Sequence, residues 1–364
     1  MRRYRRFEIM SENKKTSLEN IGEFGLIERI TAKATTNRSS TIYGVGDDAA
    51  VLRKNDKEVT LISTDMLVEG VHFNLMYTPL KHLGYKSVVV NLSDICAMNG
   101  VPEQVTVSIA VSSRFPKEAI EELYEGVHKA CDIYNVDLVG GDTTSSLSGL
   151  TISVTAVGSA LKDNVTYRNN GSENELLVVT GDLGAAYMGL QVLEREKSVY
   201  KANPKIQPDL DGYDYLLERQ LKPEARKDVV EFLKDLKIVP TTMIDISDGL
   251  ASELFHLCTQ SGVGAQVYDE KFPIDPKVST TALDFNVDPA TCVLNGGEDY
   301  ELLFSIKQED FDKMKGNPHM TVIGHFTSKD SGIYMIDKQG AAIQLKAQGW
   351  NHFQEGGGDE KDDQ

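Results

Sequence analysis

Six short acidic segments constrain this chain more than any other feature of its sequence. Each places one or two carboxylates beside glycines, hydroxyls or an amide, most of them at the end of an apolar run. They are Gly46-Asp47-Asp48, Ser63-Thr64-Asp65, Asn91-Leu92-Ser93-Asp94, Gly140-Gly141-Asp142, Asp245-Ile246-Ser247-Asp248 and Gly296-Gly297-Glu298-Asp299. Taken alone, each is more often a helix cap or a turn. Six together are hard to explain as caps and turns, so they indicate acidic side chains presented to a cleft.

The acidic segments suit Mg²⁺ better than zinc. Adjacent aspartates such as Asp47 and Asp48 repel, so such a pair is either solvated or neutralised by a cation. Carboxylates flanked by hydroxyls and glycines offer compact oxygen sites, which Mg²⁺ prefers. The seven histidines are dispersed, and the four cysteines form no pattern typical of zinc ligands.

Composition excludes several classes of function. A formal net charge of −17 argues against a nucleic-acid surface, which needs a basic stripe. No apolar run reaches the roughly 18 residues of a membrane helix. The basic N-terminus lacks the apolar core of a secretory signal, so we expect a cytoplasmic protein without membrane partners. The scattered cysteines fit small core residues in a reducing compartment.

Common nucleotide signatures are absent or misleading. Gly44-Val45-Gly46-Asp47-Asp48-Ala49 imitates a dinucleotide fingerprint, but its aspartates would repel a pyrophosphate. There is no Walker loop, and the protein-kinase set is missing. Gly184–Gly189 favours helix packing over a phosphate cradle. If the chain binds ATP, it must therefore use a different kind of nucleotide-binding site.

Hydrophobic periodicity predicts an α+β protein, since strands and helices mix without strict βαβ alternation. Helices are expected over Glu23–Thr35, Leu80–Met98, Pro116–Tyr134, Pro223–Leu236 and Leu250–Gln260, the last capped by Ser247 or Asp248. Strands are expected over Val59–Ser63, Gln104–Val111, Val136–Val139, Leu150–Leu161, Leu176–Thr180, Thr242–Ile246, Val263–Tyr268, Tyr300–Ile306, Thr321–His325 and Ile333–Ile336. The first of these strands is expected to end at Thr64, and the third to run into Gly140.

A polar stretch predicts a boundary between two domains. We expect a flexible extension over residues 1–20, an N-terminal domain over 21–163, a C-terminal domain over 164–354 and a disordered acidic tail over 355–364. The N-terminal domain would serve dimerisation and ATP and Mg²⁺ binding, and the C-terminal domain nucleotide and substrate binding.

The motifs as a series closely resemble the thiamine-monophosphate kinase family. The series is GDDAAV, ISTDMLVEGVHF, KSVVVNLSDICAMNG, LVGGDTT, VTGDLGAAYMGL, IDISDGL and NGGEDYELLF, and the resemblance covers about residues 22–353. The aspartate segments specify only the superfamily that contains aminoimidazole ribonucleotide synthetase. The segments VEGVHF and GGEDYEL and the ending GWNHF narrow it to the kinase.

The resemblance implies ATP-dependent phosphorylation of thiamine monophosphate to thiamine diphosphate on several Mg²⁺ ions, the last step of thiamine diphosphate biosynthesis. It also implies a two-domain aminoimidazole ribonucleotide synthetase-like fold, with mixed sheets covered by helices. The N-terminal halves of a homodimer would pair into a β-barrel, with active sites near the interface.

The same resemblance implies roles for individual residues. Metal-binding positions of the family match Asp48, Ser63, Thr64, Asp65, Asp94, Asp142, Asp245 and Asp248. Nucleotide-binding positions match Gly141, Asp142, Arg168 and Ser247, and substrate-binding positions match His72, Glu298 and Trp350. Asp47 would instead shape its loop or bind through water.

The chemistry agrees with this interpretation, because phosphoryl transfer between two polyanions is mostly positioning and charge neutralisation. The acceptor is a phosphate oxygen that is already ionised near neutral pH, so we expect neither a strong general base nor a covalent nucleophile. The guanidinium of Arg168 fits a nucleotide phosphate, and the face of Trp350 fits a cationic thiazolium. The alternatives are a surface arginine and a C-terminal core anchor. His72 would either donate to the acceptor phosphate or satisfy a strand end.

Two other functions compete with the kinase hypothesis. A sister ATP-dependent enzyme, such as aminoimidazole ribonucleotide synthetase, would keep the fold and change the acceptor. A non-catalytic Mg-nucleotide-binding protein would bind ATP without consuming it.

Overall fold

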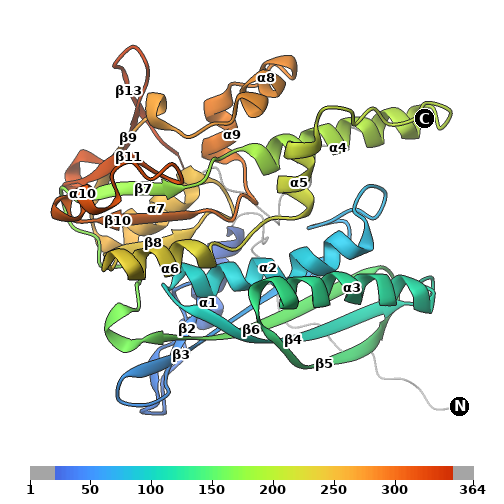
Figure 1. The fold of residues 1–364 in the computed structure, drawn as a ribbon, viewed down its shortest axis with the longest axis horizontal. Helices are drawn as coiled ribbons and strands as arrows, with labels where there is room; N and C mark the ends of the chain where they lie inside the picture. The colour runs from blue at the N-terminus through green and yellow to red at the C-terminus, as the bar shows by residue number, and fades with distance from the viewer. Residues whose placement is uncertain (1–20, 347–364) are drawn as a thin grey trace, which may run out of the picture. The chain divides into compact units, whose positions relative to one another are not determined.

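Two mixed β-sheets with helices between and around them organise the chain (Figure 1). The computed structural model describes residues 21–346, apart from the side chains of residues 22–24. The predictions for residues 1–20, for Trp350 and for the tail 355–364 lie outside the described residues. Helix α1 (Gly22–Thr31) belongs to a unit of its own and is described by itself. Everything below concerns residues 36–346.

The first sheet has the strand order β1-β2-β3-β6-β4-β5. Its strands are β1 (Thr41–Tyr43), β2 (Ala50–Arg53), β3 (Glu58–Val68), β4 (Val101–Ser112), β5 (Asp137–Ser146) and β6 (Leu150–Leu161). All neighbours pair antiparallel except β4 and β5, which are parallel. Along β6 buried and half-buried residues alternate, as expected of a sheet that packs helices on one face.

Helices α2 (Leu80–Ala97) and α3 (Lys117–Tyr134) cover one face of this sheet (Figure 1). They approach each other closely at two glycines: a Cβ on Gly84 would lie 1.9 Å from the Leu123 carbonyl oxygen, and one on Gly126 would lie 1.8 Å from the Lys81 carbonyl oxygen. No side chain fits at either position, so the two helix backbones can pack against each other directly.

The second sheet has the strand order β13-β12-β9-β11-β7-β10-β8, with one parallel pair, β9 and β12. Its strands are β7 (Leu176–Thr180), β8 (Thr242–Asp245), β9 (Gly264–Tyr268), β10 (Leu302–Ile306), β11 (Met320–Thr327), β12 (Ile333–Ile336) and β13 (Ala342–Gln344). The surrounding helices are α4 (Ala185–Ala202), α5 (Asp214–Leu221), α6 (Lys227–Leu236), α7 (Leu250–Ser261), α8 (Pro276–Asp284), α9 (Pro289–Asn295) and α10 (Phe311–Met314).

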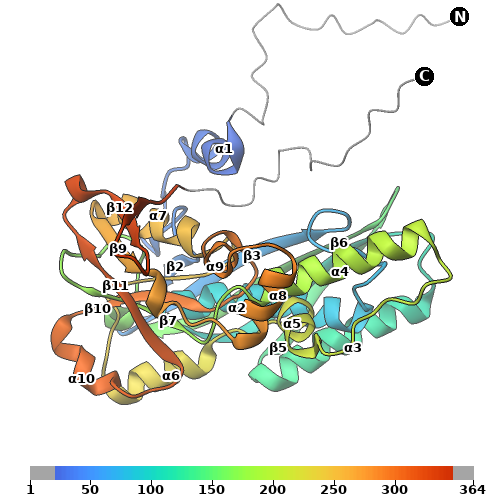
Figure 2. The same cartoon turned by 90° about the horizontal axis from the view of Figure 1, so that it is seen from above.

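Strands β7 and β10 of the second sheet are buried along almost their whole length, with helices such as α7 and α6 on opposite sides of the sheet (Figure 2). In β10, Leu303 packs with the core that includes α7, whereas Leu302 and Phe304 pack with the core that includes α6. A strand buried on both faces needs a continuous apolar run, and the LLFSI sequence of β10 is one.

Helix α2 joins the two sheets. It is buried along most of its length, and its buried residues include polar ones such as Asn91 and Ser93 as well as apolar ones. One side packs on the first sheet, while Ala97 packs with Val178 and Leu302 of the second. The α+β class with mixed sheets and covering helices is therefore confirmed.

Three local predictions were wrong. Strand β3 continues through Thr64 and Asp65 to Val68, because β6 supplies a hydrogen-bonding partner along its whole length. Strand β5 likewise continues through the Gly140-Gly141-Asp142 segment, paired with β4. Helix α7 is not capped by Ser247 or Asp248: its N-cap is Gly249, with a φ of 113°.

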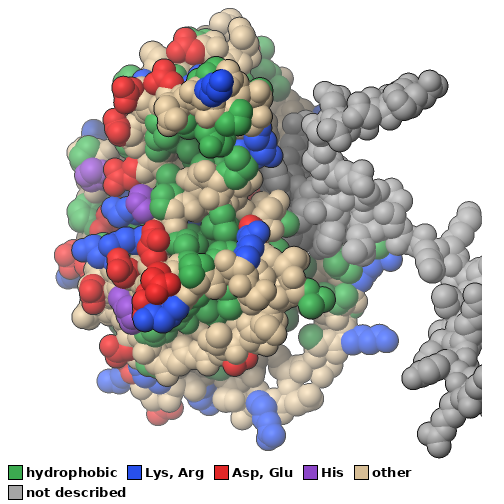
Figure 3. All heavy atoms as spheres, turned by 90° about the vertical axis from the view of Figure 1, so that its right-hand side faces the viewer, with side chains coloured by type: hydrophobic (Ala, Val, Ile, Leu, Met, Phe, Trp, Pro, Cys, Tyr) green, Lys and Arg blue, Asp and Glu red, His purple; other side chains and the backbone are tan. Residues whose placement is uncertain are grey.

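The four cysteines are all free and buried, as predicted for core residues. Among the described residues, no helix combines the length and the apolar character needed to cross a membrane. On the face shown in Figure 3, basic side chains are interspersed with acidic ones and do not form a basic stripe.

Candidate active site

Three carboxylates from three distant parts of the chain meet where the two sheets approach each other. Asp48 precedes β2, Asp94 lies in α2 and Asp245 ends β8, and each offers an oxygen within 4.8 Å of the others. Ser93 donates a hydrogen bond to Asp245 Oδ2 over 2.6 Å, and Ser63 donates to Asp94 Oδ2. We call Asp48, Asp94 and Asp245 the carboxylate cluster.

Burial and repulsion by neighbouring carboxylates disfavour the charged forms of Asp94 and Asp245. Burial, together with the charge of Asp48, raises the pKa of Asp245 to about 7. Burial also raises the pKa of Asp94 well above its usual range, and the charges of Asp65 and Asp245 add to this effect. An oxygen-only donor set of mutually repelling carboxylates fits a hard divalent cation such as Mg²⁺.

Asp65 faces the same side of the first sheet as the cluster. It shares that face with Ser63, and its backbone N–H donates to Asn91 Oδ1 of α2 over 2.9 Å. Burial by the surrounding protein, together with the charge of Asp48, raises the pKa of Asp65 to about 6.

Thr64 points to the opposite face, as alternation along a strand requires. Its hydroxyl donates to the Val154 carbonyl of β6 over 3.0 Å. The Thr64 hydroxyl is therefore not brought to the cluster.

Arg168 pairs with Asp48 from the segment that connects the two sheets. Its Nε donates to Asp48 Oδ2 over 3.1 Å, and its Nη2 contacts Asp48 Oδ1. Asp47 accepts the backbone N–H groups of Asp48 (3.1 Å) and Arg168 (3.2 Å), which is the loop-shaping role expected of it. Arg168 is thus a nearly buried partner of the cluster and not a surface arginine.

The β8–α7 loop carries Ser247 and Asp248 beside Asp245. Sequence reasoning missed the residue that supports this loop, Glu253 in the first turn of α7. Glu253 Oε1 accepts the backbone N–H of Asp248 over 3.0 Å, and the Ser247 hydroxyl lies 3.5 Å away. Burial and the charge of Asp248 raise the pKa of Glu253 well above its usual range. The available signal was an acidic residue three positions after the IDISDGL motif, in the first turn of the helix that follows it.

Two described residues, His72 and Glu298, have a predicted role in substrate binding, and they lie in the loops that follow β3 and that join α9 to β10. His72 Nδ1 accepts the Val68 N–H over 2.9 Å at the end of β3, so a neutral ring carries its proton on Nε2. His72 therefore does satisfy a strand end, while Nε2 is the nitrogen suited to donate to an anion. Glu298 adopts a left-handed backbone with a φ of 68° and forms an ion pair with Lys86.

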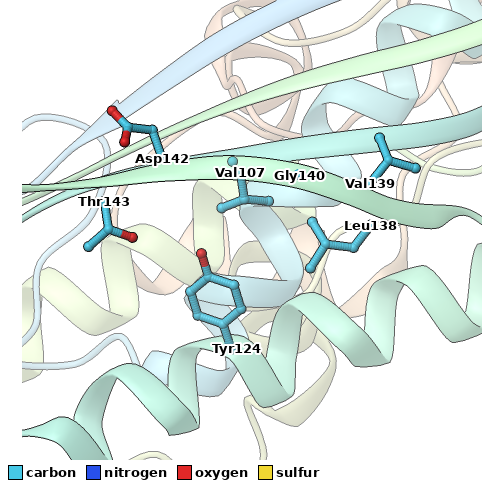
Figure 4. Close-up of a pocket in the computed structure, with 8 residues that line it drawn as sticks. Val107, Tyr124, Leu138, Val139, Gly140, Asp142 and Thr143 are labelled. Carbon is cyan, nitrogen blue, oxygen red and sulfur yellow. The ribbon is translucent and has the colours of Figure 1, made fainter.

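Gly141 and Asp142 are not brought to the cluster within one chain. They lie on the edge strand β5, three strands away from β3. Asp142 pairs in register with Ser108 and points to the face opposite α3, whereas Thr143 and Val107 point toward Tyr124 (Figure 4). A hollow of about 550 Å³ lies between this strand and Tyr124, apart from the carboxylate cluster.

Comparison with known proteins agrees with this geometry. A family model described as AIR synthase related protein, N-terminal domain, matches residues 46–160. The thiamine-monophosphate kinase of Bacillus subtilis is 32% identical over 91% of this chain and 99% of its own length. The thiamine-monophosphate kinase of Escherichia coli K12 is 31% identical over 91% of this chain and 98% of its own.

A solved structure supports the same relationship. AaThiL complexed with AMPPCP and TMP superimposes with a TM-score of 0.79 at 30% identity, covering 93% of this chain and all of its own. The fold is therefore that of the aminoimidazole ribonucleotide synthetase superfamily. On full-length similarity and on the order of its motifs, the chain belongs to the thiamine-monophosphate kinase family.

Proposed function

We propose that this chain transfers the γ-phosphoryl group of ATP to thiamine monophosphate, giving thiamine diphosphate and ADP. The observation that carries the proposal is the carboxylate cluster, found in a chain that matches thiamine-monophosphate kinases over nearly their whole length. In the proposed reaction the bond from the γ-phosphorus to the β,γ-bridging oxygen breaks. A phosphate oxygen of the acceptor forms the new bond in line with it.

Several Mg²⁺ ions would be held by Asp48, Asp65, Asp94 and Asp245, with Ser63, Thr64, Asp142 and Asp248 as further proposed ligands. Bound there, Mg²⁺ supplies charge neutralisation and alignment of the two phosphate groups. The protein's own task is to keep the carboxylates converged, which the Ser63 and Ser93 hydroxyls and the Asp47–Arg168 contact support.

Arg168 and Ser247, with Gly141 and Asp142, are proposed to bind the nucleotide. The guanidinium of Arg168 already occupies a site facing Asp48, and a bidentate fork also fits a phosphate. His72, Glu298 and Trp350 are proposed to bind thiamine monophosphate. The Nε2–H of His72 is the group suited to the acceptor phosphate.

A homodimer is proposed for the complete enzyme. The side of the first sheet away from α2 and α3 exposes apolar side chains, among them Met66, 56% exposed, and the edge strand β5 is exposed along almost its whole length. A second copy packed there through a β-barrel would cover this face and the unpaired edge. Asp142 and Gly141 would then serve a site at the interface.

Two further predictions stay proposals: two domains divided at residues 163 and 164, and a cytoplasmic location. The first is supported by the sheets, which end at Leu161 and begin again at Leu176. The core of the first sheet nevertheless includes Ala225 and Val230, so side chains from beyond the proposed boundary complete it.

A substrate panel tests the proposed function. Purified protein with Mg-ATP is offered thiamine monophosphate, thiamine or formylglycinamidine ribonucleotide, the acyclic precursor of aminoimidazole ribonucleotide. We expect thiamine diphosphate and ADP in equal amounts with the first acceptor alone. ATP consumption only with the ribonucleotide would favour the sister enzyme, and ATP binding without consumption would favour a non-catalytic protein.

A further inference from the structure

We infer that Lys86 and Gln220 are positioning residues that fix the Glu298 carboxylate for the acceptor substrate. The inference rests on the proposed function and concerns two residues to which sequence reasoning gave no role. Lys86 belongs to α2, Gln220 to α5, and Glu298 to the loop between α9 and β10. Three elements far apart in the chain therefore converge on one carboxylate.

The three side chains form a closed set of contacts. Lys86 Nζ lies 2.9 Å from Glu298 Oε1 and donates to the Gln220 main-chain carbonyl over 3.0 Å. Gln220 Nε2 donates to Glu298 Oε2 over 2.6 Å. Each carboxylate oxygen of Glu298 is thus contacted by one of two residues that also contact each other. With two engagements, a carboxylate keeps lone pairs for two more donors.

Lys86 and Gln220 are buried more deeply than the Glu298 side chain that they contact. Lys86 is 4% exposed and Gln220 is buried, whereas the Glu298 side chain is 27% exposed. An ammonium this deeply buried needs its counter-ion, because an unpaired buried charge is costly. The pair therefore presents an oriented, neutralised carboxylate to the outside, able to accept from an N–H or O–H donor of a ligand.

The backbone around Glu298 is held in a conformation that is unusual for residues other than glycine. Glu298 and Tyr300 have φ angles of 68° and 52°. The N–H groups of these residues donate to the carbonyls of Ser247 and Ile246, over 2.8 Å and 2.9 Å. Strained backbone kept in place by neighbouring structure is typical of binding sites. Here it links the Glu298 loop directly to the loop that follows Asp245.

Helix α2 sets the distance between this carboxylate and the cluster. Lys86 and Asp94 are eight residues apart on the helix, which corresponds to about 12 Å along its axis. A rigid, buried helix thus carries Glu298's counter-ion at one point and a carboxylate of the cluster at another. Lys86 is accordingly expected to affect the acceptor and not the nucleotide.

The test compares Lys86→Met and Gln220→Met with wild type, and with Lys81→Met as a control. Lys81 is exposed on the same helix and pairs with Glu125. For each variant we would measure the KM for thiamine monophosphate, the KM for ATP, kcat and the melting temperature, together with calorimetric binding of thiamine monophosphate alone. We expect both variants to raise the acceptor KM and weaken its binding by about 10-fold or more, with the KM for ATP within about 3-fold.

Lys86 and Gln220 lie on different helices. If one variant fails to fold, the other therefore still tests whether the acceptor KM changes while the KM for ATP does not. In a Glu298→Gln background, Lys86→Met should change the acceptor KM by less than about 3-fold, because its partner is already altered. An unchanged acceptor KM, equal changes in both KM values, or full additivity with Glu298→Gln would overturn the inference. A wild-type protein that does not phosphorylate thiamine monophosphate would instead refute the proposed function.

Discussion

Asp48, Asp94 and Asp245 are held together although their charges repel one another. The raised pKa values of Asp245, Asp94 and Asp65 have burial as their main cause, with neighbouring carboxylates second. An aspartate whose pKa is higher in the folded than in the unfolded protein stabilises the fold when protonated. That stabilisation is complete below about pH 4 and is lost as the pH rises through 6 and 7.

Metal binding should therefore depend on pH in a defined direction. Adding Mg²⁺ is expected to raise the melting temperature by several degrees at pH 8, where the carboxylates are ionised, and by much less at pH 5. Differential scanning fluorimetry at both pH values, with and without Mg²⁺, checks this. Equal shifts at the two pH values would mean that the cation binds elsewhere.

Glu253 offers a second prediction at this scale. Glu253→Gln keeps an Oε1 acceptor for the Asp248 N–H, whereas Glu253→Leu leaves that N–H unsatisfied. We expect Gln to retain kinase activity within a few-fold of wild type and Leu to lose about 10-fold or more. Glu231→Leu, at an exposed position of α6, is the control. Similar losses for Gln and Leu would show that charge, not hydrogen bonding, is what Glu253 contributes.

Individual site residues were predictable only in part. Asp48, Asp94 and Asp245 lie in three of the six acidic segments, and the resemblance to the family implied a metal-binding role for each; the structure brings their carboxylates within 4.8 Å of one another. Glu253 and Lys86 were not predicted as site residues. The sequence around an isolated charged residue does not show which residue it will contact in the fold. Arg168 was assigned to the nucleotide, and its contact with Asp48 appears only in three dimensions.

At the scale of elements, the crossing of α2 and α3 depends on glycine. Gly126→Ala would place a Cβ 1.8 Å from the Lys81 carbonyl, so the helices must move apart. We expect a loss of about 1–3 kcal/mol in the free energy of unfolding, measured by urea denaturation. Glu122→Ala, at an exposed position of the same helix, should stay within about 0.5 kcal/mol of wild type. Equal stabilities of Gly126→Ala and wild type would disprove the close crossing.

The strands show why element boundaries were harder to predict than the elements themselves. The apolar run of β3 does end at Ser63, yet the strand continues because β6 is long enough to pair with it. Polar residues such as Thr64 are tolerated there because they face the open side of the sheet. The hydrophobic pattern of a strand indicates which of its residues are buried. The length of the strand depends instead on how far the neighbouring strand offers backbone hydrogen bonds.

At the scale of the whole molecule, Asp142 raises the question of a second copy. Its side chain lies on the open face of the first sheet, away from the cluster. The sequence could not indicate this, since strand order brings β5 to the edge through connections that no local motif encodes. The proposed dimer gives Asp142 a role that one chain alone does not.

The molar mass of the protein in solution tests whether it forms the proposed dimer. Light scattering after gel filtration should give twice the chain mass of 40.2 kDa. Met66→Arg, on the exposed face, should yield monomers with activity reduced about 10-fold or more, whereas Ile343→Arg on β13 should leave the dimer intact. A wild-type monomer with full kinase activity would contradict the proposed assembly.

The central claim is that the carboxylate cluster supports phosphoryl transfer to thiamine monophosphate. The most direct test is the rate of thiamine diphosphate formation by wild type and by Asp94→Asn, at saturating Mg-ATP, with folding of both checked by circular dichroism. We predict that wild type forms thiamine diphosphate and that the folded variant is at least about 100-fold slower. A folded Asp94→Asn variant that works at nearly the wild-type rate would contradict the claim.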